Sequence, residues 1–163
     1  SVSVFKGNNG AAIPVDHRPD AEDDYGKYKA ECEQRVQSVN PNAMIARLGW
    51  QISRWPEGNH MLSFLLEEYQ EKGVVEASTH WHPSCCFLEE SSSALHALMK
   101  SEEPGIYHIE GNPDCNFFEI VTDLNNKLEL GLKVDEVTEP VLDNRMTDER
   151  VWVRPVRTVL EAR

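Results

Sequence analysis

Tyr25 and Lys29 are the residues whose types and spacing could carry out proton chemistry. They lie four positions apart in "DDYGKYKAECEQRV", residues 23–36, and residues i and i+4 stand one above the other on a helix. A free phenol has a pKa of about 10, and a nearby ammonium favours the phenolate, so such a pair can supply a proton near neutral pH. The same spacing is common on ordinary helix surfaces, so the meaning of the pair depends on the elements around it.

The helix that would carry this pair is predicted over residues 25–39. Its apolar residues recur at helical spacings of three and four, and Pro41 cannot continue the helix. These apolar residues are Tyr25, Tyr28, Cys32, Val36 and Val39. The alternating residues 1–5, "SVSVF", predict a strand, and residues 6–23, rich in Gly, Asn, Asp and Pro, predict a long loop.

Strand and helix patterns alternate along the rest of the chain. We expect strands at 43–50, 74–78, 105–111 and 132–140, helices at 60–72, 88–101 and 116–131, and irregular segments at 51–59 and 79–86. The helix at 88–101 should turn Leu88, Leu95, Leu98 and Met99 inward. His108 alternates with apolar residues and is interpreted as a packed sheet histidine. Such alternation predicts an α/β fold with a mainly parallel sheet.

Composition excludes several classes of protein. The 163 residues fit one globular domain, and the formal charge of −12 gives no long-range attraction for nucleic acid or an anionic membrane. We find no apolar run of membrane-spanning length and no basic-apolar signal segment, so the cytoplasm is the expected location. Four cysteines at irregular spacing are expected to be reduced.

A series of short segments resembles one known family in the same order. These segments are "VFKG" (4–7), "YGKYKAECE" (25–33), "ARLGW" (46–50), "EGNHM" (57–61), "HPS" (82–84), "GIYHIEG" (105–111) and "RPVRTVL" (154–160). They are similar to V-F-x-G, Y-G-x-x-K-x-x-x-E, R-x-x-W, G-N-x-F, x-P-T, G-x-Y-H-x-x-G and R-P-x-N-S-x-L of the extended short-chain dehydrogenase/reductase family, in particular its dTDP-4-dehydrorhamnose reductase group. The resemblance implies the C-terminal part of a Rossmann-like doubly wound parallel sheet plus a small substrate-binding region. Residues 1–50 would end the Rossmann-like domain, and residues 51–163 would form the substrate-binding region interleaved with the last strands.

The resemblance also implies an activity, the NAD(P)H-dependent reduction of a nucleotide-linked 4-keto-6-deoxy sugar in dTDP-rhamnose biosynthesis. Tyr25 would protonate the carbonyl oxygen during hydride delivery. Lys29 would lower the pKa of the phenol and hold the nicotinamide ribose, so that Tyr25 and Lys29 are also the expected cofactor-binding residues. Ser1 would occupy the position of the catalytic threonine of the family and polarise the same carbonyl.

The same resemblance assigns substrate binding to Trp50, Asn59 and Arg154. Arg154 is expected near the phosphates, where a planar guanidinium donates two hydrogen bonds. Val2 replaces an acidic residue of the group and Arg157 replaces its asparagine. These departures bear on the identity of the sugar nucleotide, and leave a related epimerase or dehydratase as an alternative.

The Gly-rich turn that binds the dinucleotide in this family has no counterpart in the chain. "GNNG", residues 7–10, is soon followed by Pro14 and opens no helix, so it is interpreted as a turn. The main binding region for NADPH or NADH is therefore absent from this chain. We expect the sequence to be a portion of a longer protein, and the 163 residues alone to bind the cofactor weakly or not at all.

Two further hypotheses concern a metal and a partner. His80, His82, Cys85 and Cys86 are zinc-type ligands, but they lack a second ligand pair at zinc-finger spacing, so no metal is expected. Neither of these cysteines is marked as a nucleophile. A non-catalytic relative, like the regulatory subunit of methionine adenosyltransferase, remains an alternative to the enzyme, and exposed sheet edges would favour a homodimer.

Overall fold

Strands and helices alternate along the chain in the computed structural model, which describes residues 1–8, 10–101 and 103–162. The elements are η1 (Val2–Val4), β1 (Ile13–Pro14), α1 (Asp24–Val39), β2 (Met44–Leu48), β3 (Trp50–Ile52), α2 (Met61–Lys72), β4 (Val75–Ser78), β5 (Trp81–His82), β6 (Cys85–Phe87), α3 (Leu88–Ser101), β7 (Gly105–Ile109), α4 (Phe117–Lys127), β8 (Val134–Val137), β9 (Leu142–Asp143), β10 (Met146–Thr147) and α5 (Val156–Glu161). The α/β class expected from the sequence is confirmed.

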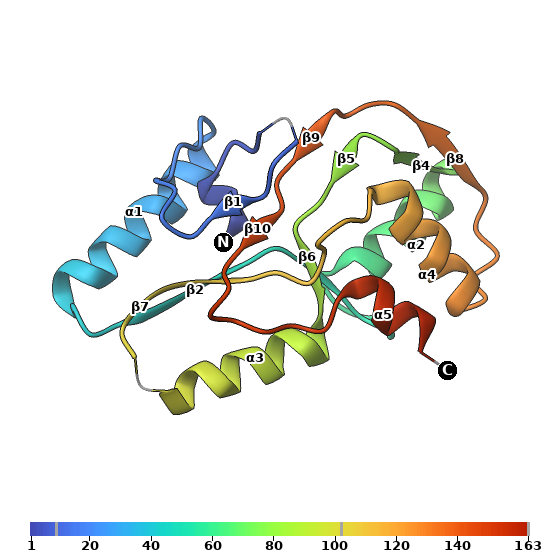
Figure 1. Cartoon of the computed structure of the whole chain (residues 1–163). Coiled ribbons are helices and arrows are strands. Elements are labelled where there is room, and N and C mark those ends of the chain that lie inside the picture. The colour runs from blue at the N-terminus through green and yellow to red at the C-terminus, as the bar shows by residue number, and fades with distance from the viewer. Residues whose placement is uncertain (9, 102, 163) are drawn as a thin grey trace.

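All five strand pairs are parallel, and each joins segments that are far apart in the sequence. The longest pair, β2 with β7, sets Met44–Leu48 opposite Gly105–Ile109. The others are β1–β10, β3–β6, β4–β8 and β5–β9. The mainly parallel arrangement is therefore confirmed, although the described residues form five two-stranded sheets instead of one continuous sheet (Figure 1).

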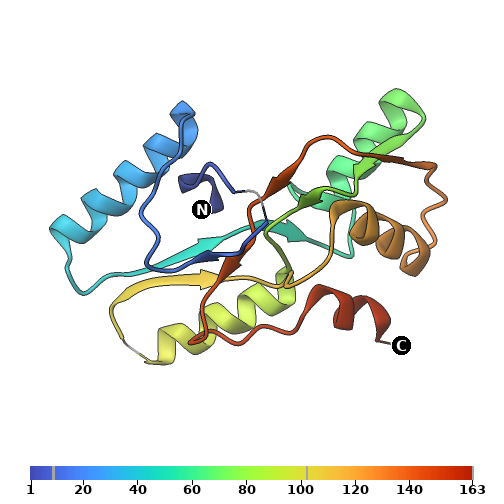
Figure 2. The ribbon, with the colours of Figure 1, turned by 45° about the horizontal axis from the view of Figure 1, so that its top comes forward.

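The β2–β7 pair lies between α1 on one side and α3 on the other, as the two ribbon views agree (Figures 1 and 2). Side chains of a following loop cover the outer edge of β7. The Asp148 carboxylate accepts from the His108 backbone N–H at 3.2 Å, and the Arg150 guanidinium donates to the Ile106 carbonyl at 2.6 Å. Asp148 and Arg150 also form an ion pair at 2.7 Å, so this edge is satisfied without a neighbouring strand.

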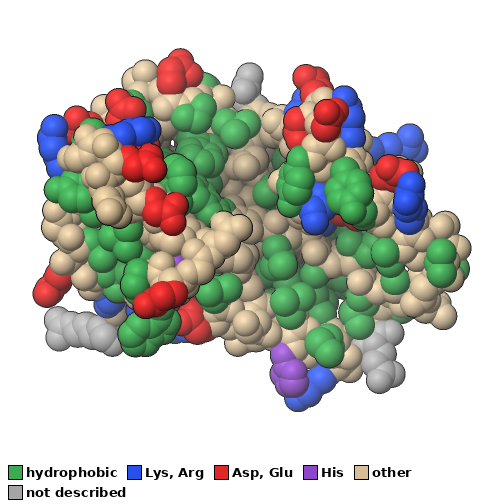
Figure 3. All heavy atoms as spheres, turned by 180° about the vertical axis from the view of Figure 1, so that it is seen from behind, with side chains coloured by type: hydrophobic (Ala, Val, Ile, Leu, Met, Phe, Trp, Pro, Cys, Tyr) green, Lys and Arg blue, Asp and Glu red, His purple; other side chains and the backbone are tan. Residues whose placement is uncertain are grey.

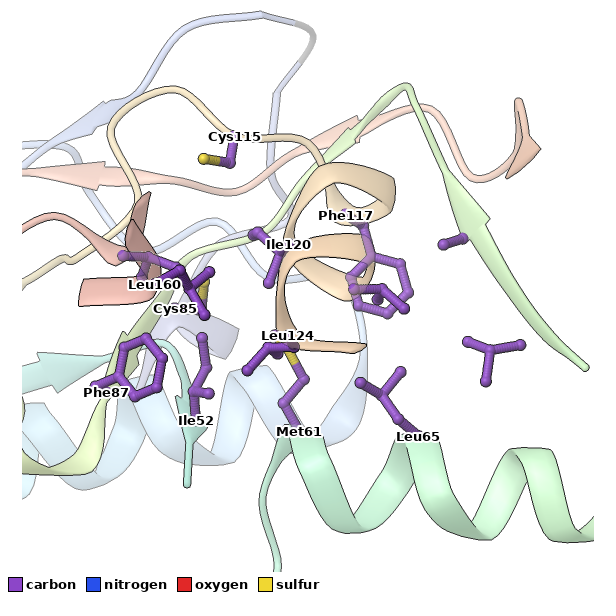
Figure 4. Close-up of a cluster of buried hydrophobic side chains, with 14 of the residues drawn as sticks. Ile52, Met61, Leu65, Cys85, Phe87, Cys115, Phe117, Ile120, Leu124 and Leu160 are labelled. Carbon is purple, nitrogen blue, oxygen red and sulfur yellow. The ribbon is translucent and has the colours of Figure 1, made fainter. Parts of the chain in front are cut away.

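The main core lies between α2, α4, α5 and the strands near them. Its buried members include Ile52, Met61, Leu65, Phe87, Ile120, Leu124 and Leu160, and Figure 4 shows these side chains converging from α2, α4, β3, β6 and α5. A smaller cluster of Val4, Phe5, Ile13 and Met146 holds the N-terminal segment against β10. Ala30 of α1 packs against this cluster, so the helix that carries Tyr25 lies next to it.

Local capping residues mark the ends of two of the predicted helices, α2 and α4. The His60 side chain accepts from the Ser63 N–H at the start of α2, and Gly73, with φ of 72°, ends it. In α4, the Asn116 side chain accepts from the Glu119 N–H and the Glu119 carboxylate accepts from the Asn116 N–H, a capping box. These caps account for the helices expected at 60–72 and 116–131, although α4 ends at Lys127, before the expected end at residue 131. The helix expected at 88–101 is confirmed as α3.

Several predictions for short segments are wrong. Residues 1–5 do not form a strand: Val2–Val4 is a 3₁₀ turn, because the Ser1 side chain accepts from the Ser3 N–H at 3.2 Å. The segments expected to be irregular contain β3, β5 and β6, which form only through pairing with distant strands. Leu88 and Met99 are 40% and 71% exposed instead of inward, because α3 leaves that side uncovered.

The apolar stripe of α1 also reaches the surface. Its exposed members are Tyr25, Tyr28, Val36 and Val39, while the buried residues of this helix are Gly26 and Glu33. Hydrophobic side chains also lie between charged ones on the face seen from behind (Figure 3). Within the described residues, no helix is both long and apolar enough to cross a bilayer.

Candidate active site

Tyr25 and Lys29 lie in the first turns of α1, whose N-terminal capping residue is Asp23. The Asp23 carboxylate accepts from the Gly26 N–H at 2.8 Å and so fixes the start of the helix. The Lys29 ammonium lies 5.4 Å from the centre of the Tyr25 ring, so the two side chains meet as the i, i+4 spacing requires. Tyr25 is 57% exposed and Lys29 is half-buried, so both can reach a bound molecule.

Ser1 lies at the same end of α1. The segment that carries it packs against the helix at Gly26, where a Cβ would collide with the Ser3 carbonyl oxygen and with the Ala21 side chain. The segment that carries Ser1 and the Tyr25–Lys29 pair, which hold the three residues expected to be catalytic, therefore lie at the same end of α1.

A buried ion pair holds α1 to the sheet one turn beyond Lys29. Glu33 faces Arg47 of β2, whose Nε lies 3.0 Å from Oε1 and whose Nη2 lies 2.7 Å from Oε2. The Arg47 and Glu33 side chains are 1% and 10% exposed. Arg47 Nη1 also donates to His108 Nε2 at 3.2 Å, and its guanidinium lies 4.9 Å from the centre of the Phe5 ring.

His108 is neutral in this cluster. Burial lowers its pKa to about 4, and the Arg47 charge acts in the same direction. Because Nε2 accepts from Arg47, the proton of the neutral ring is on Nδ1. The interpretation of His108 as a packed sheet histidine is confirmed, since it is 1% exposed.

Sequence reasoning missed the roles of Glu33 and Arg47, although a signal was present. Arg47 is the one charged residue in "AMIARLGW", a run that reads as a buried strand. A buried guanidinium needs a carboxylate partner and further acceptors. Glu33, four residues after Lys29, is the nearest preceding carboxylate in the sequence, but only the structure shows that it faces the sheet.

Trp50 lies in an aromatic cluster at the start of β3. Its ring stacks on Trp81 and Phe117, with centroids 6.0 Å away in both cases, and meets Phe64 edge-on at 5.2 Å. Phe117 is buried and Phe64 is 44% exposed. Trp50 is therefore held by packing, with one side of its cluster near the surface.

Asn59 and Arg154 are exposed, and each lies away from α1. Asn59 precedes α2, whose capping residue is its neighbour His60. The Arg154 guanidinium donates to the Glu90 carboxylate of α3, with Nε at 3.0 Å. Among the described residues, no hydrogen bond, ion pair or ring contact links Trp50, Asn59 or Arg154 to Tyr25.

Glu110 is a second acid with an enclosed carboxylate that sequence reasoning did not single out. Its Oε1 accepts from the backbone N–H of Asn112 at 2.7 Å and of Cys85 at 3.3 Å, and its Oε2 accepts from Met146 at 2.8 Å. Burial raises the pKa of Glu110 to about 7 although these hydrogen bonds lower it. The residue lines a cavity of about 300 Å³ that also contacts Asp148.

The zinc-type residues do not converge in the described part of the chain. No group of three or more His, Cys, Asp or Glu residues there is arranged to hold a metal ion. Burial raises the pKa of Cys86 to about 11 and that of Cys85 well above its ordinary value. These thiols therefore stay protonated and are poor nucleophiles.

Comparisons with known proteins identify the family and the fold. Residues 1–157 match the family described as the RmlD substrate binding domain. Among curated proteins, the chain is 23% identical over 159 residues to the spore coat polysaccharide biosynthesis protein SpsK of Bacillus subtilis, a match that covers 98% of this chain and 55% of that protein.

Solved structures show the same fold. A dTDP-4-dehydrorhamnose reductase from Bacillus anthracis, solved in complex with NADP, matches with a TM-score of 0.83 at 17% identity, over 98% of this chain and 61% of that one. A dTDP-4-dehydrorhamnose reductase from Clostridium acetobutylicum matches with a TM-score of 0.83 at 15% identity, over 98% and 61%. A UDP-N-acetylglucosamine 4-epimerase from Bacillus cereus matches with a TM-score of 0.73 at 13% identity, over 99% and 60%.

The chain thus spans somewhat more than half the length of these relatives. The family match, by contrast, extends over nearly all of its own residues, from the Ser1 segment through α1 to α5. The chain belongs to the RmlD substrate binding domain family.

Proposed function

We propose that this chain is the catalytic-helix and substrate-binding portion of an NAD(P)H-dependent reductase that acts on a nucleotide-linked 4-keto-6-deoxy sugar. The observation that carries the proposal is the geometry at the start of α1. There an accessible phenol, a lysine ammonium 5.4 Å from its ring and a serine segment packed on the same turn meet within a family that includes such reductases.

Each of the three side chains has a separate role. Tyr25 donates a proton to the oxygen of the sugar ketone, because a phenol held by a helix can reach a ligand from the exposed side. Lys29 stabilises the phenolate that remains, since a cation near an acid favours its charged form. Ser1 donates a hydrogen bond to the same ketone oxygen and so polarises the carbonyl.

The residues present fit one end of a nicotinamide cofactor. Bound NAD(P)H would supply the hydride, and Lys29, half-buried beside Tyr25, would hold the ribose next to the nicotinamide. The residues present do not provide a comparable site for the pyrophosphate of the cofactor. Apart from Arg18, every arginine among the described residues lies within ion-pair distance of a carboxylate, and the sequence has no Gly-rich turn whose backbone N–H groups would bind the pyrophosphate.

Substrate binding by Trp50, Asn59 and Arg154 is part of the proposal. The aromatic cluster around Trp50 could support a planar or apolar face of the sugar nucleotide. Arg154 could donate to a phosphate, but only if the phosphate takes the place of Glu90 on the guanidinium. A phosphate contact at Arg154 therefore predicts that Glu90 moves when the substrate binds.

The decisive experiment uses the complete protein that contains this chain. NADPH oxidation is followed with dTDP-4-dehydrorhamnose as substrate, in the wild type and in the Tyr25→Phe variant. We expect kcat to fall by about 10²–10⁴-fold in Tyr25→Phe, because the variant loses the proton donor and keeps the ring. Retained turnover would refute the assignment of Tyr25.

The matched control is Tyr28→Phe. Tyr28 lies one turn further along α1 and is 60% exposed, so the variant removes the same atom from the same helix. Its kcat should equal that of the wild type. Equal losses in both variants would mean that a phenol on α1 matters for folding and not for proton transfer.

A second function, that of a non-catalytic binding subunit, is favoured by the exposed stripe of α1. Tyr25, Tyr28, Val36 and Val39 form an apolar face at helical spacing, which is suited to a partner helix. Co-purification of the complete protein with a larger enzyme, together with no NADPH oxidation, would support this function. A homodimer in the cytoplasm would use the same kind of surface, and light scattering of the purified protein would detect it.

The missing Gly-rich turn leads to a prediction for the 163 residues alone. Their affinity for NADPH should be weak, with a Kd in or above the range of about 1 mM, because they bind the nicotinamide end without anchoring the pyrophosphate. Isothermal titration calorimetry measures this directly. A low-micromolar Kd would overturn the prediction.

A further inference from the structure

The helix α1 is attached to the rest of the molecule in an unusual way. Across its 16 residues, its buried positions are Gly26 and Glu33, and its apolar stripe is exposed. Burial of apolar side chains, which normally fixes a helix on a sheet, therefore contributes little here. Two contacts of another kind must hold the helix in place.

The first contact is the close approach at Gly26. The absence of a Cβ lets the Ser3 carbonyl lie directly against the helix. The Asp23 carboxylate, which accepts from the Gly26 N–H, fixes the same turn. This contact sets the distance between α1 and the Ser1 segment, but by itself it leaves the helix free to pivot about its first turn.

The second contact is the Glu33–Arg47 ion pair. Both carboxylate oxygens of Glu33 are bound by the planar guanidinium, so the pair fixes direction as well as distance. Arg47 is in turn oriented by the His108 ring of β7. Glu33 is thereby tied to both strands of the β2–β7 pair.

Phe5 connects this ion pair to the Ser1 segment. Its ring contacts both the Arg47 guanidinium, 4.9 Å from the ring centre, and the His108 ring, whose centroid is 5.7 Å away. The segment that carries Ser1 therefore contacts the same group that holds α1. One buried cation consequently touches both parts of the proposed catalytic set.

We infer that the cluster of Glu33, Arg47, His108 and Phe5 is a positioning device, which sets the orientation of Tyr25 and Lys29 relative to Ser1. The inference rests on the proposed function for the meaning of that orientation. Gly26 directly follows Tyr25 along the helix, and Glu33 lies four residues after Lys29, so each residue of the pair has one of the two contacts close to it. Glu33, Arg47, His108 and Phe5 touch no reacting atom and act through the helix and the Ser1 segment.

The test begins with amide hydrogen exchange on the 163-residue chain. Glu33→Gln removes the charge and keeps the shape, and Glu31→Gln is the matched control, because Glu31 pairs with Arg35 on the surface of the same helix. We expect the amides of residues 27–30 to exchange about tenfold faster in Glu33→Gln, with α4 unchanged. Glu31→Gln should resemble the wild type.

Kinetics of the complete protein form the second readout. Glu33→Gln should lower kcat by about 10²-fold while KM stays within about twofold, since a misplaced catalytic group affects the chemical step more than binding. Arg47→Lys keeps the charge but cannot make the forked contact, so it should give a partial loss of kcat. If Glu33→Gln does not fold, Arg47→Lys carries both measurements.

The outcomes separate the two claims. Wild-type turnover in Tyr25→Phe removes the proposed function, whereas amide exchange still decides whether the cluster holds the helix. Unchanged exchange at residues 27–30 in Glu33→Gln overturns the inference. So does a loss of kcat that is as large in Glu31→Gln as in Glu33→Gln.

Discussion

Glu110 makes the stability of this chain depend on pH in a direction opposite to that of most carboxylates. Burial raises its pKa from 4.5 to about 7, so the folded state keeps a proton that the unfolded state releases. The contribution is fully present below pH 4.5 and is lost as the pH rises through 7. The difference between the two pKa values corresponds to about 3 kcal/mol of unfolding free energy.

This magnitude depends on how the carboxylate is enclosed. Glu110 as a whole is partly buried, but its two oxygens accept three backbone N–H groups from Cys85, Asn112 and Met146. Those bonds favour the carboxylate, and the raised pKa means that the loss of water outweighs them. A carboxylate that was fully solvated at the surface would not have a raised pKa.

The assay is urea unfolding of wild type and Glu110→Gln at constant ionic strength, from about pH 5 to about pH 8. Glutamine does not titrate. Its NH₂ group would face one of the backbone N–H groups that donate to the carboxylate, so the variant loses one hydrogen bond. That cost is the same at every pH. The free energy of unfolding of Glu110→Gln relative to wild type should therefore increase by about 2.5 kcal/mol across this range, because the unfolded carboxyl is already mostly ionised at pH 5.

Glu149→Gln is the control, because Glu149 is an exposed carboxylate in the loop after Asp148. Its unfolding free energy should run parallel to that of the wild type over the whole range. The reasoning is refuted if the curve of Glu110→Gln is also parallel to that of the wild type. In that case the three hydrogen bonds, and not burial, determine the pKa of the Glu110 carboxylate.

Three further variants test other contacts by thermal or urea unfolding of the same chain. Arg47→Met should cost about 3–5 kcal/mol, because it leaves the Glu33 carboxylate buried and unpaired; the double variant with Glu33→Met should recover most of that loss, and a double variant no more stable than Arg47→Met would contradict this. Gly26→Ala should cost about 1–3 kcal/mol, since the added Cβ meets a backbone carbonyl that cannot turn aside; an unchanged midpoint would mean that the Ser1 segment moves freely. Arg154→Ala should change stability by less than about 1 kcal/mol, because its ion pair with Glu90 is 46% exposed on the arginine side; a larger loss would show that this pair is structural.

The elements that sequence could predict are those with local causes. The helix at 88–101 has the bounds expected from its pattern, and the helix at 60–72 ends at Gly73, whose positive φ suits glycine. The strand at 105–111 is bounded by glycines and is observed as Gly105–Ile109. In each case the residues that decide the structure lie within the segment itself.

The elements that sequence missed have distant causes. β5 has two residues, and it is a strand because it pairs with Leu142–Asp143 of β9. Residues 1–5 alternate like a strand, yet Val4 and Phe5 are buried against Ile13 and Met146 in a turn. Tertiary contacts here override the local pattern, as they do for many short segments.

The candidate site divides in the same way. The spacing of Tyr25 and Lys29 can be read from the sequence, and the two side chains do meet. The Glu33–Arg47 pair could not be assigned, because the partner of a buried arginine depends on which face of α1 turns toward the sheet. The apolar stripe of α1 even predicts that the opposite face of the helix turns toward the sheet, since apolar residues normally point inward.

The pairing of strands also determines when this chain can fold. Every strand pair is interrupted by at least one helix, and β1 near the N-terminus pairs with β10, Ile13 with Met146. The β1–β10, β4–β8 and β5–β9 pairs cannot form until the C-terminal part has been synthesised, and closing such long loops is slow. Folding is expected in milliseconds to seconds instead of microseconds, which stopped-flow refolding would measure. Until residue 146 has left the ribosome, the N-terminal segment that carries Ser1 has no complete core to pack against.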